Sequence, residues 1–153
     1  MGSARAAWEL VQPGELDPQI AALAGKRAGL QRRLALLARD PCDPRLNAYR
    51  LSGPLGTIVC GLHLDRGYRL AFTTQPPLTK EDRPRVVLLY VGKREPRNRA
   101  GDDLWDVLHD IFGVQNPPSD HDKPPCCDRG HPTIDHEALT SFLKELKSFN
   151  RGR

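Results

Sequence analysis

The chain has 153 residues, which suits one domain with a hydrophobic core and is too short for two domains of ordinary size. Hydrophobic residues make up 39% of it, and its 14 prolines and 13 glycines predict substantial loops. No apolar run approaches the length of a membrane span, and the N-terminus lacks the pattern of a signal peptide, so we expect a cytoplasmic protein without membrane contact.

The net charge of +4 is unevenly distributed along the chain. Residues 46–100 carry 10 basic and 4 acidic side chains, whereas residues 101–153 carry 6 basic and 10 acidic ones. The basic middle segment favours a polyanionic partner, with nucleic acid the usual candidate. Arginines scattered over an ordinary solvated surface would give the same count.

The first 45 residues predict a short strand followed by helices. Residues 7–11 (AWELV) are typical of a strand, and Asp17 followed by Pro18 is typical of a helix N-terminus. Apolar residues at helical spacings then predict either one long amphipathic helix or two short helices broken near Gly25. The prolines within residues 40–44 end this helical region.

After a short strand at residues 48–51, two longer runs predict a β-hairpin whose loop is Asp65-Arg66-Gly67. If Gly67 is left-handed in a three-residue loop, one face of the hairpin is apolar throughout. A two-residue loop would mix apolar and charged side chains on each face, which half-buried strands resist. The three-residue loop pairs His63 with Arg69, and the small residues beside this pair leave room over the sheet. The full predicted register is Leu64–Tyr68, His63–Arg69, Leu62–Leu70, Gly61–Ala71, Cys60–Phe72 and Val59–Thr73.

The remaining elements complete an α+β fold, in which N-terminal helices pack on a small, mostly antiparallel sheet and extra helices follow at the C-terminus. Residues 86–91 are continuously apolar and predict a central strand. Asp102 or Asp103 can cap a helix that ends at Gly113. We expect a compact domain at residues 1–113 and, at residues 114–153, a proline-rich linker followed by an amphipathic helix capped by Asp135.

The residues His63, Arg69 and Arg94, with Trp105 on the following helix, form the first candidate site. RNA cleavage without a metal requires a base for the ribose 2′-hydroxyl, cations for the charge on the phosphate and a proton for the departing 5′-oxygen. A histidine titrates near neutral pH, and arginine pairs with phosphate oxygens. An aromatic ring can stack a base. A surface histidine and a cross-sheet ion pair are the plain structural alternatives for His63 and Arg69.

A second candidate site comprises metal-ligand residue types within a short stretch. Adjacent cysteines do not give the spacing with which two thiolates chelate one zinc ion, so we expect no metal and no cofactor. The four cysteines show no disulfide-framework spacing, and we expect reduced thiols. The residues concerned are His121, Asp122, Cys126, Cys127 and His131.

Two motifs and the order of elements carry a family resemblance. The hairpin strand with GYRL (residues 67–70) and the apolar strand that runs into VGKRE (residues 91–95) resemble the RelE toxins, the RNA-cleaving members of the RelE/ParE superfamily. The resemblance covers about residues 16–112. It implies a bacterial toxin of a type II toxin–antitoxin system that cuts messenger RNA on the ribosome and is inhibited by a cognate antitoxin.

The resemblance also implies roles for individual residues. The arginines of the two motifs, Arg69 and Arg94, are expected to be catalytic, and His63 stands where the family uses a lysine as base or charge stabiliser. The expected products are a 2′,3′-cyclic phosphate and a 5′-hydroxyl. A ParE-like inhibitor of DNA gyrase and a non-toxic module that binds RNA or protein are the alternatives. The expected RNA-binding residues are Arg50, Arg66, Lys93, Arg97, Arg99 and Trp105.

Overall fold

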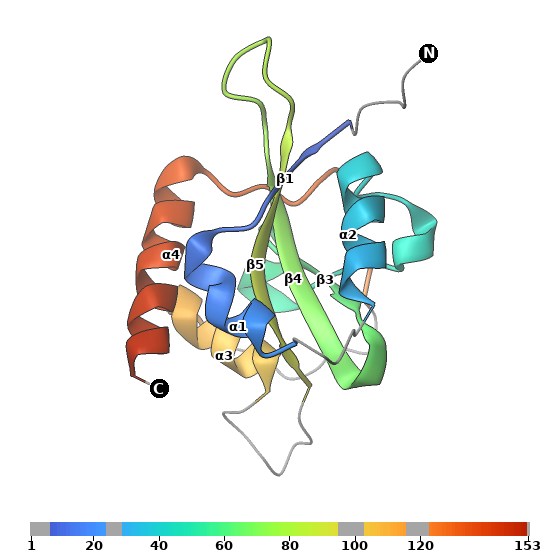
Figure 1. Ribbon diagram of the computed structural model, residues 1–153. Coiled ribbons are helices and arrows are strands. Elements are labelled where there is room, and N and C mark those ends of the chain that lie inside the picture. Colours follow the sequence, from blue (N-terminus) through green and yellow to red (C-terminus); the bar gives the residue numbers. More distant parts are fainter. Residues whose placement is uncertain (1–6, 24–28, 95–102, 116–122, 153) are drawn as a thin grey trace.

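The computed structural model describes residues 7–23, 29–94, 103–115 and 123–152. These residues form an α+β fold, as predicted, and its sheet has five strands (Figure 1). All neighbouring strands are antiparallel except β1, which runs parallel to β5. The order across the sheet is β1 (Glu9–Val11), β5 (Arg85–Lys93), β4 (Tyr68–Gln75), β3 (Cys60–His63) and β2 (Tyr49–Arg50).

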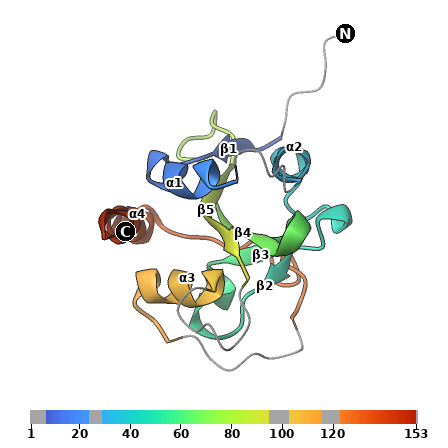
Figure 2. The ribbon, with the colours of Figure 1, turned by 60° about the horizontal axis from the view of Figure 1, so that its bottom comes forward.

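The predicted central strand is β5, which lies between β1 and β4. Its six apolar residues, 86–91, are each at most 8% exposed, because helices cover both faces of the sheet here. Figure 2 shows α1 (Asp17–Ala21) and α2 (Leu30–Arg39) on one side of the sheet and α3 (Leu104–Phe112) on the other. The predicted helical region is therefore two short helices.

The hairpin of β3 and β4 has the predicted register. Its pairs are His63–Arg69, Leu62–Leu70, Gly61–Ala71 and Cys60–Phe72, and the Leu64 amide donates to the Tyr68 carbonyl at 2.9 Å. Gly67 in the loop has a φ of 81°, the left-handed conformation that the three-residue loop requires. Strand β3 begins at Cys60, so the expected pair Val59–Thr73 lies beyond its end.

The two C-terminal helices have the predicted caps. The Asp103 side chain accepts a hydrogen bond from the Trp105 amide at the start of α3, and Gly113 ends this helix with a φ of 74°. The Asp135 side chain accepts from the Ala138 amide at the start of α4 (His136–Arg151). Helix α4 packs against α3 and buries Phe142 and Leu146 in the same hydrophobic core as the sheet. Residues from both predicted segments, 1–113 and 114–153, thus share one core.

Residues 123–134, predicted as part of a linker, form a strap along the edge of the sheet; we call them the C-terminal strap. Its backbone accepts from the Arg50 amide and donates to the Ala48 carbonyl beside β2. Further along, the Ile134 amide donates to the Thr74 carbonyl in β4 at 3.2 Å. The strap therefore satisfies backbone groups that an open sheet edge would expose.

Two disulfides fasten the strap, and the expectation of reduced thiols is corrected by the structure. Cys126 is bonded to Cys60 in β3, and Cys127 is bonded to Cys42, which precedes β2. The sequence separations are 66 and 85 residues, so linear spacing carries no signal for either pair. Within the described ranges, no helix has both the length and the apolar character needed to cross a membrane.

Candidate functional site

The sheet brings together the three residues predicted to be catalytic. His63 ends β3 and lies opposite Arg69 in β4, which in turn lies opposite Gly92 in β5. Arg94 directly follows β5, and its amide donates to the Gly67 carbonyl of the hairpin loop at 3.0 Å. Three separate strands thus deliver an imidazole and two guanidinium groups to one corner of the sheet.

Tyr49 and Lys123 also belong to this cluster, and sequence reasoning missed both. Tyr49 lies in β2 opposite Gly61, and its ring centroid is 5.6 Å from that of His63. The Lys123 ammonium lies 4.7 Å from the centre of the Tyr49 ring, a cation–π contact. Lys123 reaches the cluster because the strap folds back beside β2, which no local pattern around residue 123 signals. We call His63, Arg69, Arg94, Tyr49 and Lys123 the corner cluster.

The concentration of positive charge changes the acidity of these groups. Partial burial lowers the pKa of His63 below 6.5, and repulsion from Arg69, Lys123 and Arg94 lowers it further. Burial also lowers the pKa of Lys123, again assisted by the two arginines. The imidazole is therefore neutral at neutral pH and can accept a proton, while the lysine is a stronger acid than an isolated ammonium group.

Tyr49 remains a hydrogen-bond donor over the physiological range. Its side chain is 7% exposed, and burial raises the pKa of the phenol to about 12 although Arg69 and Arg94 act in the opposite direction. Arg69 is held by a 3.0 Å hydrogen bond from Nη1 to the Tyr68 carbonyl, and its Nε is buried without a hydrogen-bond partner among the described residues. A bound phosphate oxygen would supply such a partner.

Trp105 fills the space that was expected above the small residues of the hairpin, so the expectation of open room over Gly61 is wrong. A Cβ atom at Gly61 would lie 2.5 Å from the far edge of the indole. The ring is 7% exposed and meets Tyr49 edge-on at a centroid distance of 6.1 Å. In this position the indole packs against the Tyr49 ring, and too little of its surface is exposed to stack a base.

The other predicted RNA-binding residues divide into three groups. Arg50 is 9% exposed, and its guanidinium donates to the carbonyls of Gly56 and Gly130, so it joins β2 to the strap instead of facing solvent. Arg66 and Lys93 are exposed at the hairpin end of the sheet, beside the corner cluster. Arg97 and Arg99 lie outside the described residues.

Of the candidate metal ligands, the described ones, Cys126, Cys127 and His131, do not form one site. His121 and Asp122 lie outside the described residues, and Cys126 and Cys127 contact different partners. A different set comes together, with one donor atom each from Cys42, Cys127 and His131, all within 4.8 Å of one another.

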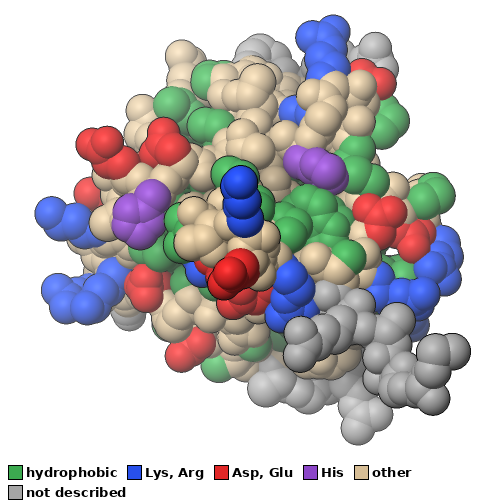
Figure 3. All heavy atoms as spheres, turned by 90° about the horizontal axis from the view of Figure 1, so that it is seen from above, with side chains coloured by type: hydrophobic (Ala, Val, Ile, Leu, Met, Phe, Trp, Pro, Cys, Tyr) green, Lys and Arg blue, Asp and Glu red, His purple; other side chains and the backbone are tan. Residues whose placement is uncertain are grey.

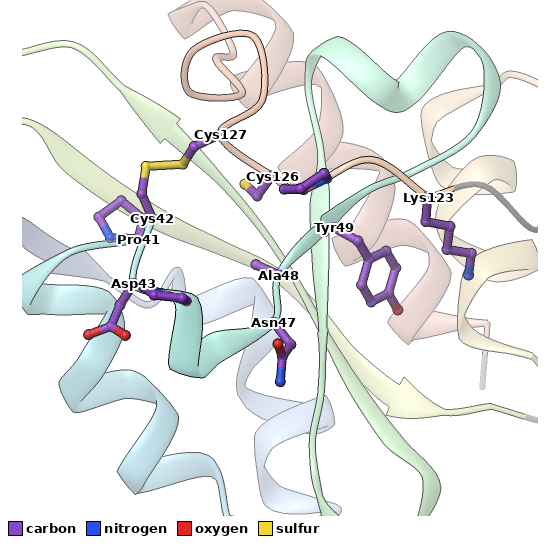
Figure 4. A pocket seen from close by; sticks show the side chains of 11 residues that line it. Pro41, Cys42, Asp43, Asn47, Ala48, Tyr49, Lys123, Cys126 and Cys127 are labelled. Atoms are coloured by element: carbon purple, nitrogen blue, oxygen red, sulfur yellow. A yellow bond between two sulfur atoms is a disulfide. The ribbon is translucent and has the colours of Figure 1, made fainter.

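A groove runs from the two cysteines of this set to Tyr49 and Lys123 of the corner cluster. Figure 4 shows the Cys42–Cys127 disulfide at one end and the Tyr49 and Lys123 side chains at the other. Between them the groove is lined by residues that precede β2, including Asn47 and Ala48. Among the described residues, the end of the molecule opposite the corner cluster has no comparable concentration of positive charge. Figure 3 shows Lys and Arg side chains interspersed with Asp and Glu at that end.

Comparisons of the chain with protein-family models, with curated proteins and with solved structures gave no match in any of the three. The site must therefore be interpreted from its own chemistry.

Proposed function

We propose that this protein is a metal-independent endoribonuclease and that the corner cluster is its active site. The observation that carries the proposal is the pairing of His63 with Arg69 across the hairpin, with Arg94 and Lys123 close enough to lower the pKa of the imidazole. A neutral base beside several cations is what in-line attack by a ribose 2′-hydroxyl on a phosphodiester requires.

Each residue has one role in the proposed reaction. His63 accepts the proton of the 2′-hydroxyl, the 2′-oxygen attacks phosphorus, and the bond from phosphorus to the 5′-oxygen breaks. Arg69 holds the scissile phosphate and Arg94 stabilises the charge that develops on it. The Lys123 ammonium gives its proton to the departing 5′-oxygen. The products are a 2′,3′-cyclic phosphate and a 5′-hydroxyl.

The exposed cations around the cluster extend the proposed RNA surface. Arg66 and Lys93 lie at the same end of the sheet and can bind neighbouring phosphates. The Tyr49 phenol, which stays protonated, can donate to a phosphate or ribose oxygen. With the two RelE-like motifs on adjacent strands, these features support a toxin that cuts messenger RNA on the ribosome and whose corner cluster an antitoxin would cover.

The test has an in vitro and a cellular part. Purified protein is incubated with ribosomes translating a defined messenger RNA in excess chelator specific for transition metals, and 5′-hydroxyl ends are mapped. Cuts within translated codons are expected, and His63→Ala and Arg94→Ala should abolish them. Lys80→Ala is the matched control, because Lys80 is exposed in the loop between β4 and β5 at the other end of the molecule.

Induction of the same variants in a bacterial host separates this proposal from its alternatives. Intact RNA together with inhibited DNA gyrase would replace it with a ParE-like function. Intact RNA and normal growth at every dose would instead indicate a binding module. Cleavage that persists in both His63→Ala and Arg94→Ala would refute the assigned active site.

A further inference from the structure

The cluster of Cys42, Cys127 and His131 lies at the end of the groove away from the proposed active site and has no role in the proposed reaction. The three donor atoms come from two distant parts of the chain and lie within 4.8 Å of one another. Two thiol sulfurs and one imidazole nitrogen are a ligand set for zinc, which binds sulfur at about 2.3 Å and nitrogen at about 2.0–2.1 Å.

Bonds that do not involve sulfur hold the two cysteines in place. The Cys42 amide donates to the Asp40 carboxylate at 2.8 Å. On the strap, the Cys126 amide donates to the Ala48 carbonyl at 2.9 Å and the Asp128 amide donates to the Pro125 carbonyl at 3.1 Å, which fixes the backbone on both sides of Cys127. None of these three hydrogen bonds involves a sulfur atom of the disulfide.

His131 is positioned by its neighbours in the same way. Its ring lies against the Trp8 indole, with a centroid distance of 4.8 Å, and the carbonyl of the next residue, Pro132, accepts from the Thr74 amide and hydroxyl. The imidazole is exposed, so a hydrated metal ion can reach it from solvent.

We propose that Cys42, Cys127 and His131 bind one zinc ion when the Cys42–Cys127 disulfide is reduced. A dithiol reductant supplies two electrons and two protons to break the sulfur–sulfur bond, and the two thiols lose their protons as zinc binds. Three protein ligands leave the fourth tetrahedral position to water. Bound zinc and the disulfide would each hold the strap next to Cys42. Because both use the same two sulfur atoms, only one of them can be present at a time.

The other disulfide does not compete for the metal. Cys60 and Cys126 are 0% and 2% exposed, and among the described residues no third ligand joins them. Cys126 and Cys127 are adjacent but serve different partners, so the double variant Cys60→Ala/Cys126→Ala retains all three ligands of the proposed zinc site. This variant also leaves only two thiols in the protein, which makes the spectroscopy unambiguous.

The experiment titrates Co²⁺, and then Zn²⁺, into protein that has been reduced with a phosphine and freed of reductant under anaerobic conditions. The reduced parent and the Cys60→Ala/Cys126→Ala variant should each bind one Co²⁺ with tetrahedral visible bands and a thiolate-to-cobalt charge-transfer band, and Zn²⁺ should displace it. The oxidised protein should show neither band. Cys42→Ser and His131→Ala should weaken binding by about tenfold or more.

Controls distinguish the proposed site from weak surface binding. His136→Ala removes an exposed histidine at the start of α4 and should leave the Co²⁺ spectrum and affinity unchanged. Far-ultraviolet circular dichroism reports whether each variant is folded. Absence of a charge-transfer band in the folded, reduced parent would overturn the proposal, as would parental affinity in both Cys42→Ser and His131→Ala. None of these readouts depends on ribonuclease activity.

Discussion

The indole of Trp105 lies directly on Gly61, so that the contact between α3 and the hairpin depends on the absence of a side chain at residue 61. Gly61→Ala would place a Cβ 2.5 Å from the ring, and either the indole or the strand must move. We expect the free energy of unfolding to fall by about 1–3 kcal/mol, the usual cost of overpacking a core.

Urea denaturation followed by tryptophan fluorescence measures this loss. Gly14→Ala is the matched control, because a Cβ at that residue meets no atom within 4 Å. Equal stability of the two variants would show that Trp105 yields without cost. An indole that moves without cost could also move out of the core, which would make Trp105 a better candidate for stacking a base than its burial suggests.

The charge of Arg69 should control the titration of His63. Partial burial and then the neighbouring cations, Arg69 first among them, hold the pKa of His63 below 6.5, so Arg69→Gln should raise it part of the way toward that value. Proton NMR of the imidazole measures the pKa directly and requires no assumption about function. Arg66→Gln, which removes an exposed loop arginine, should shift it less. An unchanged His63 pKa in Arg69→Gln would refute the coupling.

The same pKa sets the pH dependence of the proposed cleavage. His63 must be neutral to accept a proton, so the acid limb of the rate profile should fall as the pH drops below 6.5 through the lowered pKa. The unfolded chain binds this proton more tightly than the folded protein, so the free energy of unfolding should decline over the same interval. Single-turnover rates at saturating protein give the profile, and an acid limb above pH 6.5 would contradict the assignment.

Lys123 should matter for the chemical step more than a nearby surface lysine does. Lys123→Met removes the proposed proton donor while keeping the length of the side chain, and should slow cleavage by about 10²-fold or more. Lys93→Met, at the exposed end of β5, is the control and should affect mainly binding of RNA. Equal effects of the two variants on the single-turnover rate would assign Lys123 to RNA binding alone.

The strap should loosen when its buried disulfide is removed. Cys60→Ala/Cys126→Ala retains the Cys42–Cys127 disulfide but frees the part of the strap that carries Lys123. We expect a loss of about 2–4 kcal/mol in the free energy of unfolding and faster hydrogen exchange of the Arg50 amide, which donates to the Pro124 carbonyl of the strap. The Ile134 amide, which donates to the Thr74 carbonyl at the other end of the strap, provides the internal comparison. Unchanged exchange of the Arg50 amide would show that backbone hydrogen bonds alone hold the strap.

Local signals in the sequence were sufficient to predict the helix ends, the hairpin and the pairing of His63 with Arg69 in the site. The caps Asp103 and Asp135, the stop at Gly113 and the register of the hairpin depend on neighbouring residues, and the structure has each of them as predicted. Since the register follows from alternation around one glycine turn, the pairing of His63 with Arg69 could be derived before any fold was known.

Contacts between distant segments decided the rest. Lys123 contacts Tyr49, and Cys42 is bonded to Cys127, only because the strap folds back to the edge of the sheet. The two-residue periodicity of a strand and the 3.6-residue periodicity of a helix report local structure and cannot predict this contact between distant segments. The burial of Trp105 over Gly61 likewise depends on where α3 docks. The sequence by itself determined which residues face each other within a hairpin, because that is local backbone geometry. Only the tertiary structure decided which cations, thiols and aromatic rings gather around it, because long-range packing places them.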